Sequence, residues 1–213
     1  MTDYPANTVI DLLQRGATAA PAIGAPSVAE ASAREATGRP WLTYGRLRDL
    51  TARTVADLNG MGIGRGDRVA IVAPNGPEMA TAFVAIVTGA TTAPLNPAYK
   101  ADEFRFYLSD LDAKALVIRQ GMDSPARGVA AERGIPVVEL IPTTQGPAGD
   151  FTLKPEQPLS GAPARPGPAG ADDVALVLHT SGTTSRPKIV PLRHVNVTAS
   201  AYNVAETLAL TPD

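Results

Sequence analysis

Residues 66–95, GDRVAIVAPNGPEMATAFVAIVTGATTAPL, contain the pattern that decides the fold. A Gly-Asp turn signal precedes a short run over residues 68–73, apolar from Val69 onward, which predicts a buried strand. The proline after it stands near the start of a helix that we expect over residues 77–87, and residues 91–95 predict the next strand. Strands joined by a helix of this length are typical of a parallel sheet with right-handed crossovers.

The same alternation continues on both sides of this unit. Thr43 is expected to cap a long helix whose apolar residues fall on one face. Further helices are expected near residues 11–13, 28–37, 101–109 and 126–133, and further strands over residues 115–118 and 137–140. We therefore expect an α/β fold in which residues 1–141 form a first α/β subdomain.

The composition changes after residue 141. Prolines and glycines concentrate in residues 142–171, a density that disfavours regular structure and predicts a long surface connection. Residues 172–213 are then expected to begin a second subdomain. In it, the apolar run 174–178 predicts a strand, residues 189–192 predict a second strand, and a helix is expected to begin near His194 or Asn196.

The segment between those two strands, TSGTTSRPK over residues 180–188, has the composition of a polyphosphate-binding loop. Backbone N–H groups near Gly182 can point at phosphate oxygens, the hydroxyls can donate further hydrogen bonds, and Lys188 supplies a positive charge. The segment is not a Walker loop, because proline precedes the lysine and isoleucine follows it. On composition alone, a Ser/Thr-rich surface turn is the competing interpretation.

The residue pattern of this segment resembles that of a known family. LHTSGTTSRPK, residues 178–188, is similar to the phosphate-binding signature of AMP-forming adenylating enzymes, which include acyl-CoA synthetases, peptide-synthetase adenylation domains and luciferases. The SRPK form, followed by Pro191 and Leu192, resembles the branch that contains oxalate-CoA ligases. LTY at 42–44, GDRV at 66–69, PN at 74–75 and PLNP at 94–97 occur in the family's order, so the resemblance runs from about residue 25 to the C-terminus.

The resemblance implies a layered α/β sheet of the acyl-CoA synthetase N-terminal domain type, in truncated form. It implies a carboxylate that attacks the α-phosphorus of ATP to give acyl-adenylate and pyrophosphate, followed by displacement of AMP by the CoA thiol. The cofactors implied are ATP, Mg²⁺ and CoA. The phosphate contacts implied are Thr180, Ser181, Gly182, Thr183, Thr184 and Lys188, and no residue of the chain is expected to be catalytic or a metal ligand.

Parts of the family's enzyme are not expected in this chain. By resemblance, these are the adenine-binding segment, the aspartate that holds the ribose, the hinge and the C-terminal catalytic lysine. The expected partners are ATP, a carboxylic acid, and either the remainder of the enzyme or a second copy of the chain.

Two departures from the family's signature bear on activity. Ser185 occupies a position that is often glycine in the wider family, although the SRPK form is at home in the oxalate-like branch. The second departure is the more important one. Ile189 follows the lysine, where the family usually has glycine. If that position requires a positive φ, isoleucine costs about 1–2 kcal/mol or more and weakens nucleotide binding. If the backbone is extended there, isoleucine fits well.

The two histidines are expected to be structural. His179 ends an apolar strand and is interpreted as a strand-end residue with one satisfied nitrogen, with a role near the acyl or nucleotide site as the less favoured alternative. His194 lies near a helix start and is interpreted as an orienting or capping residue. Neither has metal-ligand spacing with another histidine, and the chain has no cysteine.

Composition excludes several other function classes. The 213 residues carry a net charge of −2 and are 44% hydrophobic, which gives no indication of nucleic-acid binding. No apolar window is long enough for a membrane span, and the N-terminus lacks the pattern of a secretory signal. The expected location is the cytoplasm.

Three interpretations remain open. The first is the N-terminal part of an AMP-forming acyl-CoA synthetase, an acid–thiol ligase of the kind that acts in fatty acid metabolism. This part is expected to be inactive alone. The second is a non-catalytic module that binds nucleotide phosphates or a partner. The third is an adenylating enzyme that loads a carrier-protein thiol.

Overall fold

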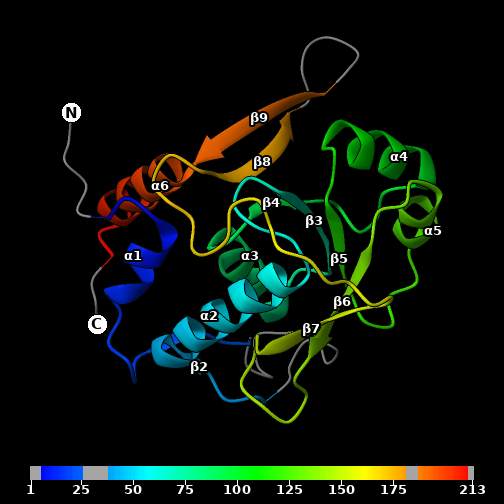
Figure 1. Ribbon diagram of the computed structural model, residues 1–213. Coiled ribbons are helices and arrows are strands. Elements are labelled where there is room, and N and C mark those ends of the chain that lie inside the picture. The colour runs from blue at the N-terminus through cyan, green and yellow to red at the C-terminus, as the bar shows by residue number, and fades with distance from the viewer. Residues whose placement is uncertain (1–5, 26–37, 181–186, 211–213) are drawn as a thin grey trace.

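The computed structural model describes residues 6–25, 38–180 and 187–210. The chain alternates helices and strands through most of that length (Figure 1). The helices are α1 Val9–Gln14, α2 Tyr44–Gly60, α3 Pro77–Val87, α4 Ala101–Asp110, α5 Pro125–Glu132 and α6 His194–Thr207. The strands are β1 Pro21–Ile23, β2 Leu42–Thr43, β3 Arg68–Val72, β4 Thr91–Pro94, β5 Ala115–Arg119, β6 Val137–Pro142, β7 Phe151–Pro155, β8 Val174–Thr180 and β9 Lys188–Arg193.

The main sheet has seven strands in the order β7-β6-β5-β3-β4-β8-β9. Its inner strands pair in parallel, whereas β7 and β9 pair antiparallel at the two edges. The α/β fold with a parallel sheet that the 66–95 pattern predicts is confirmed. Because β8 pairs with β4, the strand that leads into the predicted phosphate loop belongs to the same sheet as the 66–95 unit.

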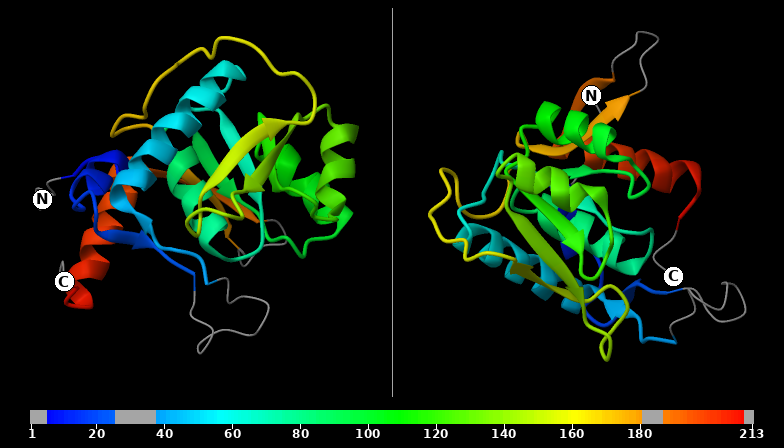
Figure 2. Two further views of the ribbon diagram at one scale, coloured as in Figure 1. Left: turned by 90° about the horizontal axis from the view of Figure 1, so that it is seen from below. Right: turned by 90° about the vertical axis from the view of Figure 1, so that its right-hand side faces the viewer.

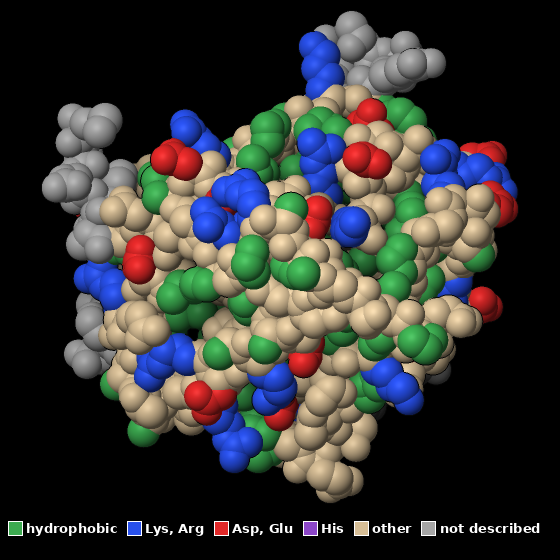
Figure 3. Space-filling model, viewed as in Figure 1, with side chains coloured by type: hydrophobic (Ala, Val, Ile, Leu, Met, Phe, Trp, Pro, Cys, Tyr) green, Lys and Arg blue, Asp and Glu red, His purple; other side chains and the backbone are tan. Residues whose placement is uncertain are grey.

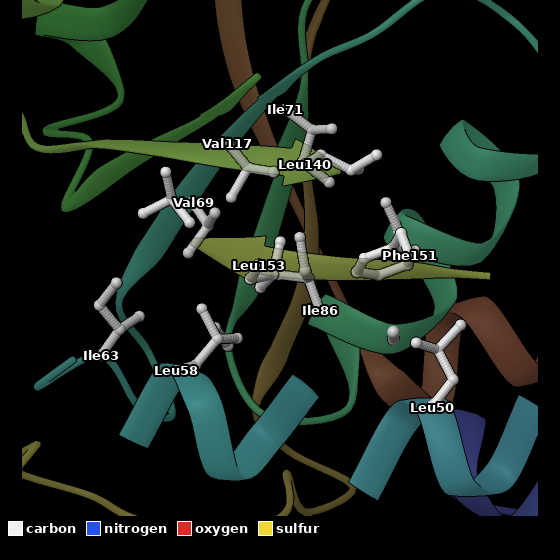
Figure 4. Close-up of a cluster of buried hydrophobic side chains, with 14 of the residues drawn as sticks. Leu50, Leu58, Ile63, Val69, Ile71, Ile86, Val117, Leu140, Phe151 and Leu153 are labelled. Carbon is white, nitrogen blue, oxygen red and sulfur yellow. The ribbon is translucent and has the colours of Figure 1, made fainter. Parts of the chain in front are cut away.

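Helices cover both faces of the sheet (Figure 2). Along β3, Val69 and Ile71 face the cluster formed with α2 and α3, and Ala70 and Val72 face the cluster formed with α4 and α5. Figure 4 shows the first cluster, in which Ile71 lies among side chains of β5, β6 and β7. Full burial of a valine or isoleucine side chain contributes about 1.5–3 kcal/mol, which explains why β3 is apolar from Val69 to Val72.

The local signals for helix starts are confirmed in the structure. The Thr43 side chain accepts a hydrogen bond from the Arg46 N–H at 3.3 Å and caps α2. Pro77 occupies the first turn of α3, where no N–H is required. The helix expected over residues 28–37 lies outside the described residues.

Three strands were not expected, the short strands β1 and β2, which pair with each other, and β7. β7 lies inside the segment 142–171, where proline and glycine density predicts no regular structure, and that prediction is wrong for residues 151–155. Phe151 and Leu153 are buried while Thr152 and Lys154 are exposed, so an alternation of period two is present. Pro155 is tolerated because it ends an edge strand, where its missing N–H costs little. The division into subdomains at residues 142–171 stays a prediction.

Candidate functional site

The strand β8 reaches the carboxyl edge of the parallel sheet, where open α/β sheets usually bind ligands. Its pairing with β4 consists of Thr92 opposite Leu176. Two threonine hydroxyls of β4 add to this attachment, because Thr91 donates to the Val174 carbonyl at 2.6 Å and Thr92 to the Ala175 carbonyl at 3.0 Å. The base of β8 is therefore held by β4, and its last residues project beyond that strand.

The strands β8 and β9 form an antiparallel hairpin around the predicted phosphate loop (Figure 1). Thr180 pairs with Lys188, and His179 pairs with Ile189. Directly opposed residues of an antiparallel pair place their side chains on the same face of the sheet. Thr180 and Lys188 therefore share one face of the hairpin, and His179 and Ile189 share the other.

The structure locates two of the six predicted phosphate contacts. Thr180 is the last residue of β8 and Lys188 is the first of β9, and both are exposed. The remaining four, Ser181, Gly182, Thr183 and Thr184, lie outside the described residues. The strand pairing places the Thr180 hydroxyl and the Lys188 ammonium group on the same face of the hairpin, one at each end of the loop. This arrangement suits a phosphate.

Ile189 lies in extended backbone. It is the second residue of β9, and the non-glycine residues with positive φ in the described chain are Asp112 and Ala209. Its side chain packs against the cluster formed by the sheet with α4 and α5. The position therefore requires no glycine, and isoleucine is the kind of residue that a half-buried strand favours.

His179 has a partner on α4 that the sequence did not indicate. Its Nε2 lies 3.0 Å from Oδ2 of Asp110, and its ring meets that of Tyr107 edge-on, with centroids 4.7 Å apart. The prediction of a strand-end histidine with one satisfied nitrogen is confirmed. The apolar periodicity of residues 101–109 predicts that a face of this helix is buried, but it cannot show which strand end lies opposite Asp110.

His194 orients the N-terminal helix and does not cap its own. It is the first residue of α6 and fully buried, and its Nδ1 accepts the Val9 N–H at 3.2 Å. The Arg193 N–H at the helix start is bonded instead by the Asn196 side chain at 2.9 Å. Figure 1 shows α1 beside α6, so this histidine links the two ends of the described chain.

The unfolding free energy is expected to decrease as the pH falls, because His194 is buried in its neutral form. Burial lowers the pKa of His194, against the opposing influence of the Asp173 and Asp11 carboxylates and the Val87 carbonyl. The unfolded chain then binds the proton first, so stability is complete above the unfolded pKa of about 6.5 and is lost as the pH falls toward the lower folded value. The slope reaches at most about 1.4 kcal/mol per pH unit.

Urea unfolding at pH 7.5 and at pH 5.5 measures this loss. His194→Asn keeps an acceptor for the Val9 N–H but cannot titrate, so its two unfolding free energies should lie closer together than those of the unmodified chain. An equal pH dependence in both proteins would contradict the assignment.

A carboxylate anchors the base of the hairpin. Asp173 accepts hydrogen bonds from Arg65 Nε at 2.7 Å, from the Gly170 N–H at 2.7 Å, and from Arg165. Burial opposes ionisation, but these donors outweigh it and hold the pKa of Asp173 below its usual value. The backbone carbonyl of Asp173 accepts the His194 N–H at 3.1 Å, so the same residue connects β8 with α6.

A separate cleft lies at the amino-terminal ends of the parallel strands, on the side of the sheet away from the hairpin tip. It has a volume of about 960 Å³, and its lining includes Arg68, Lys114 and Arg133. The helices α4 and α5 end at this edge, and their C-terminal dipoles carry partial negative charge. Arg68 offsets this charge directly at the end of α4, where its Nη1 donates to the Leu111 carbonyl at 2.9 Å, and we do not place the phosphate site in this cleft.

The described residues show neither a metal centre nor a membrane span. No group of three or more His, Cys, Asp and Glu side chains within residues 6–25, 38–180 and 187–210 could hold a metal ion. None of the helices in that part of the chain combines the length and the apolar character that crossing a bilayer requires. Cationic and acidic side chains are interspersed on the face shown in Figure 3.

Comparisons with known proteins identify the family of this chain. The family described as AMP-binding enzyme matches residues 22–213. The chain is 39% identical over 178 residues to an oxalate–CoA ligase of Arabidopsis thaliana, covering 82% of this chain and 34% of that protein. It is 40% identical over 169 residues to an oxalate–CoA ligase of Saccharomyces cerevisiae, covering 70% and 31%.

A solved structure is similar over nearly the whole chain. ATP-bound MatB from Rhodopseudomonas palustris superposes with a TM-score of 0.70 at 25% identity, covering 97% of this chain and 39% of that one. The chain spans about a third of the length of the curated relatives it matches.

Proposed function

Because the chain belongs to the AMP-binding enzyme family, we propose that its β8–β9 hairpin binds the phosphates of ATP in an AMP-forming acid–CoA ligase. The acid would be activated as its adenylate, with pyrophosphate leaving from the loop, and then transferred to the CoA thiol. The oxalate–CoA ligases among the relatives favour a small carboxylic acid as the substrate.

The observation that carries this proposal is the pairing of Thr180 with Lys188. It sets a hydroxyl and an ammonium group on one face of the hairpin, at the two ends of the SGTTSR segment and at the carboxyl edge of the sheet. Hydrogen bonds to charged groups contribute about 1.5–3 kcal/mol each, so a few of them are enough to hold a triphosphate. The ATP-bound state of R. palustris MatB supports the choice of nucleotide.

Magnesium would arrive with the nucleotide. The described residues supply no cluster of ligands for it, and Mg²⁺ is commonly bound through substrate phosphates with few protein ligands. Lys188 would then share the neutralisation of phosphate charge with the ion.

We further propose that residues 1–213 bind ATP without turning it over. The relatives are about three times longer than the matched stretch, and we assign the adenine, ribose and acid contacts to their additional sequence. The chain should therefore bind tripolyphosphate about as well as ATP, because the phosphates supply its contacts.

Two assays test this function. Calorimetry with MgATP, with tripolyphosphate and with AMP should show binding of the first two and little binding of AMP. Pyrophosphate exchange with a panel of small carboxylic acids should show no adenylate formation by this chain. Absence of MgATP binding by the folded chain would contradict the proposed site, and adenylate formation would contradict the assignment of the missing contacts.

Replacing Ile189 with glycine should not improve nucleotide binding. The family's usual glycine would bring no relief of strain, because the backbone at Ile189 is already extended. It would remove a packed side chain and loosen a strand, at an expected cost of about 1–3 kcal/mol of unfolding free energy. Urea unfolding and MgATP calorimetry on Ile189→Gly check both points, and tighter ATP binding by this variant would show that isoleucine disables the loop.

A further inference from the structure

The tip of the hairpin, residues 178–180 and 187–190, extends beyond the strand pairing that holds its base. The pairing of β8 with β4 is at Leu176, and the threonine hydroxyls of β4 donate to the carbonyls of Val174 and Ala175. In the described part of the chain, no strand pairing joins the tip to a strand other than its own two. The tip therefore needs another attachment if Thr180 and Lys188 are to keep fixed positions.

That attachment is made by His179 to α4. The His179 side chain is only 7% exposed, and its Nε2 lies 3.0 Å from Oδ2 of Asp110, which is 39% exposed. Among the described residues of the tip, this is the polar side-chain contact to the rest of the molecule. A hydrogen bond to a carboxylate in a partly dry site is stronger than one between neutral groups.

Aromatic rings surround the contact and restrict the histidine ring. Tyr107 meets it edge-on at 4.7 Å, and Phe106 lies 6.3 Å away in a similar orientation. Tyr107 in turn stacks on Tyr99, with centroids 4.8 Å apart and planes inclined by 15°. Ile189, on the same face of the hairpin as His179, packs against the same cluster.

His179 lies on the face of the hairpin away from Thr180 and Lys188, so it does not share their proposed contact with phosphate. His179 and Ile189 face α4, whereas Thr180 and Lys188 lie on the opposite face. A group on the α4 side cannot contact a phosphate held by Thr180 and Lys188. It can only fix the backbone on which they stand.

We propose that His179 is a positioning residue, which holds the hairpin tip on α4 through Asp110 and thereby fixes Thr180 and Lys188 in place for the phosphates of ATP. The inference rests on the proposed function for its ligand, whereas the contact itself is a property of the fold. Preorganisation improves affinity because the ordering cost is met before the ligand binds. Loss of the contact should therefore weaken ATP binding without removing any group that touches ATP.

The test compares His179→Ala, His179→Gln and Asp110→Ala with the unmodified chain. The first readout is amide hydrogen exchange over residues 174–193 without nucleotide. Exchange in His179→Ala and Asp110→Ala should be about 5- to 30-fold faster, the factor that corresponds to one or two kcal/mol. His179→Gln places an amide N–H near the position of Nε2 and should restore slow exchange. Asp172→Ala, which breaks an exposed ion pair with Arg193 at the other end of the hairpin, is the control and should exchange as the unmodified chain does.

The second readout is MgATP affinity by calorimetry, which a purely structural contact would not change. His179→Ala and Asp110→Ala should bind about 5- to 30-fold more weakly, and His179→Gln nearly as tightly as the unmodified chain. Unchanged exchange in both alanine variants would overturn the contact as an attachment. Faster exchange with unchanged ATP affinity would overturn its positioning role. Absence of ATP binding by the unmodified chain would contradict the proposed function, while the exchange rates would still decide whether the attachment exists.

Discussion

Replacing Lys188 with alanine is expected to weaken MgATP binding by about tenfold to a hundredfold. Lys188 begins β9 opposite Thr180 and is exposed, so its ammonium group is available to a ligand and its loss should not affect folding. One hydrogen bond to a charged group contributes about 1.5–3 kcal/mol, and 1.4 kcal/mol is a factor of ten in affinity. Isothermal titration calorimetry on the variant and on the unmodified chain measures the change.

Lys154 provides the matched control for this prediction. It is an exposed lysine on β7, the edge strand farthest from β9 in the same sheet, and Lys154→Ala removes the same charge from the protein. Its MgATP affinity should stay within about twofold of the unmodified chain, since a distant surface charge is screened by salt. Equal weakening in both variants would mean that net charge, and not the loop, sets the affinity.

Replacing Asp173 with alanine is expected to lower the unfolding free energy by about 2–4 kcal/mol, close to the cost of breaking a buried ion pair. The carboxylate side chain is only 6% exposed and accepts bonds from Arg65, Arg165 and the Gly170 N–H. Its removal leaves the Gly170 N–H without its acceptor and releases the Pro/Gly-rich segment from the base of β8. The arginines are more exposed than the carboxylate, which keeps the expected cost below that of a fully buried pair.

The adjacent acid gives the control for this substitution. Asp172 is 88% exposed and pairs with an exposed arginine, so Asp172→Ala should cost about 0–1 kcal/mol. The pH dependence gives a second check. Because the folded pKa of Asp173 is lowered, its stabilisation is complete above the unfolded pKa of about 3.9 and is lost as the pH falls through the folded value. The difference between the unmodified chain and Asp173→Ala in urea unfolding should therefore narrow below about pH 4, and a constant difference would contradict the assignment.

The elements whose signals are local in sequence could be predicted. The run over residues 69–73 is apolar at every position because β3 is buried on both faces, and Thr43 and Pro77 mark their helix starts through capping and a fixed φ. β7 could not be recognised in the same way, because its alternation is short and lies among prolines. A proline in the sequence indicates a break in regular structure, but an edge strand can contain one, as β7 does at Pro155.

Contacts between distant segments could not be predicted for the site. The chemistry of residues 180–188 is readable in sequence, because hydroxyls, a glycine and a lysine are the groups that phosphates require. The Asp110 partner of His179 lies 69 residues away and depends on how α4 crosses the sheet. The question about Ile189 was likewise a question of backbone conformation, which the pairing with His179 answers and residue type alone cannot.

Amide hydrogen exchange with and without saturating MgATP, read along the whole chain, locates the nucleotide most directly. Added protection is expected only in the β8–β9 hairpin and its intervening loop, residues 174–193, with no change at the cleft near Arg68 and Lys114. Protection at that cleft, with none in the hairpin, would show that the nucleotide binds there and not at the hairpin.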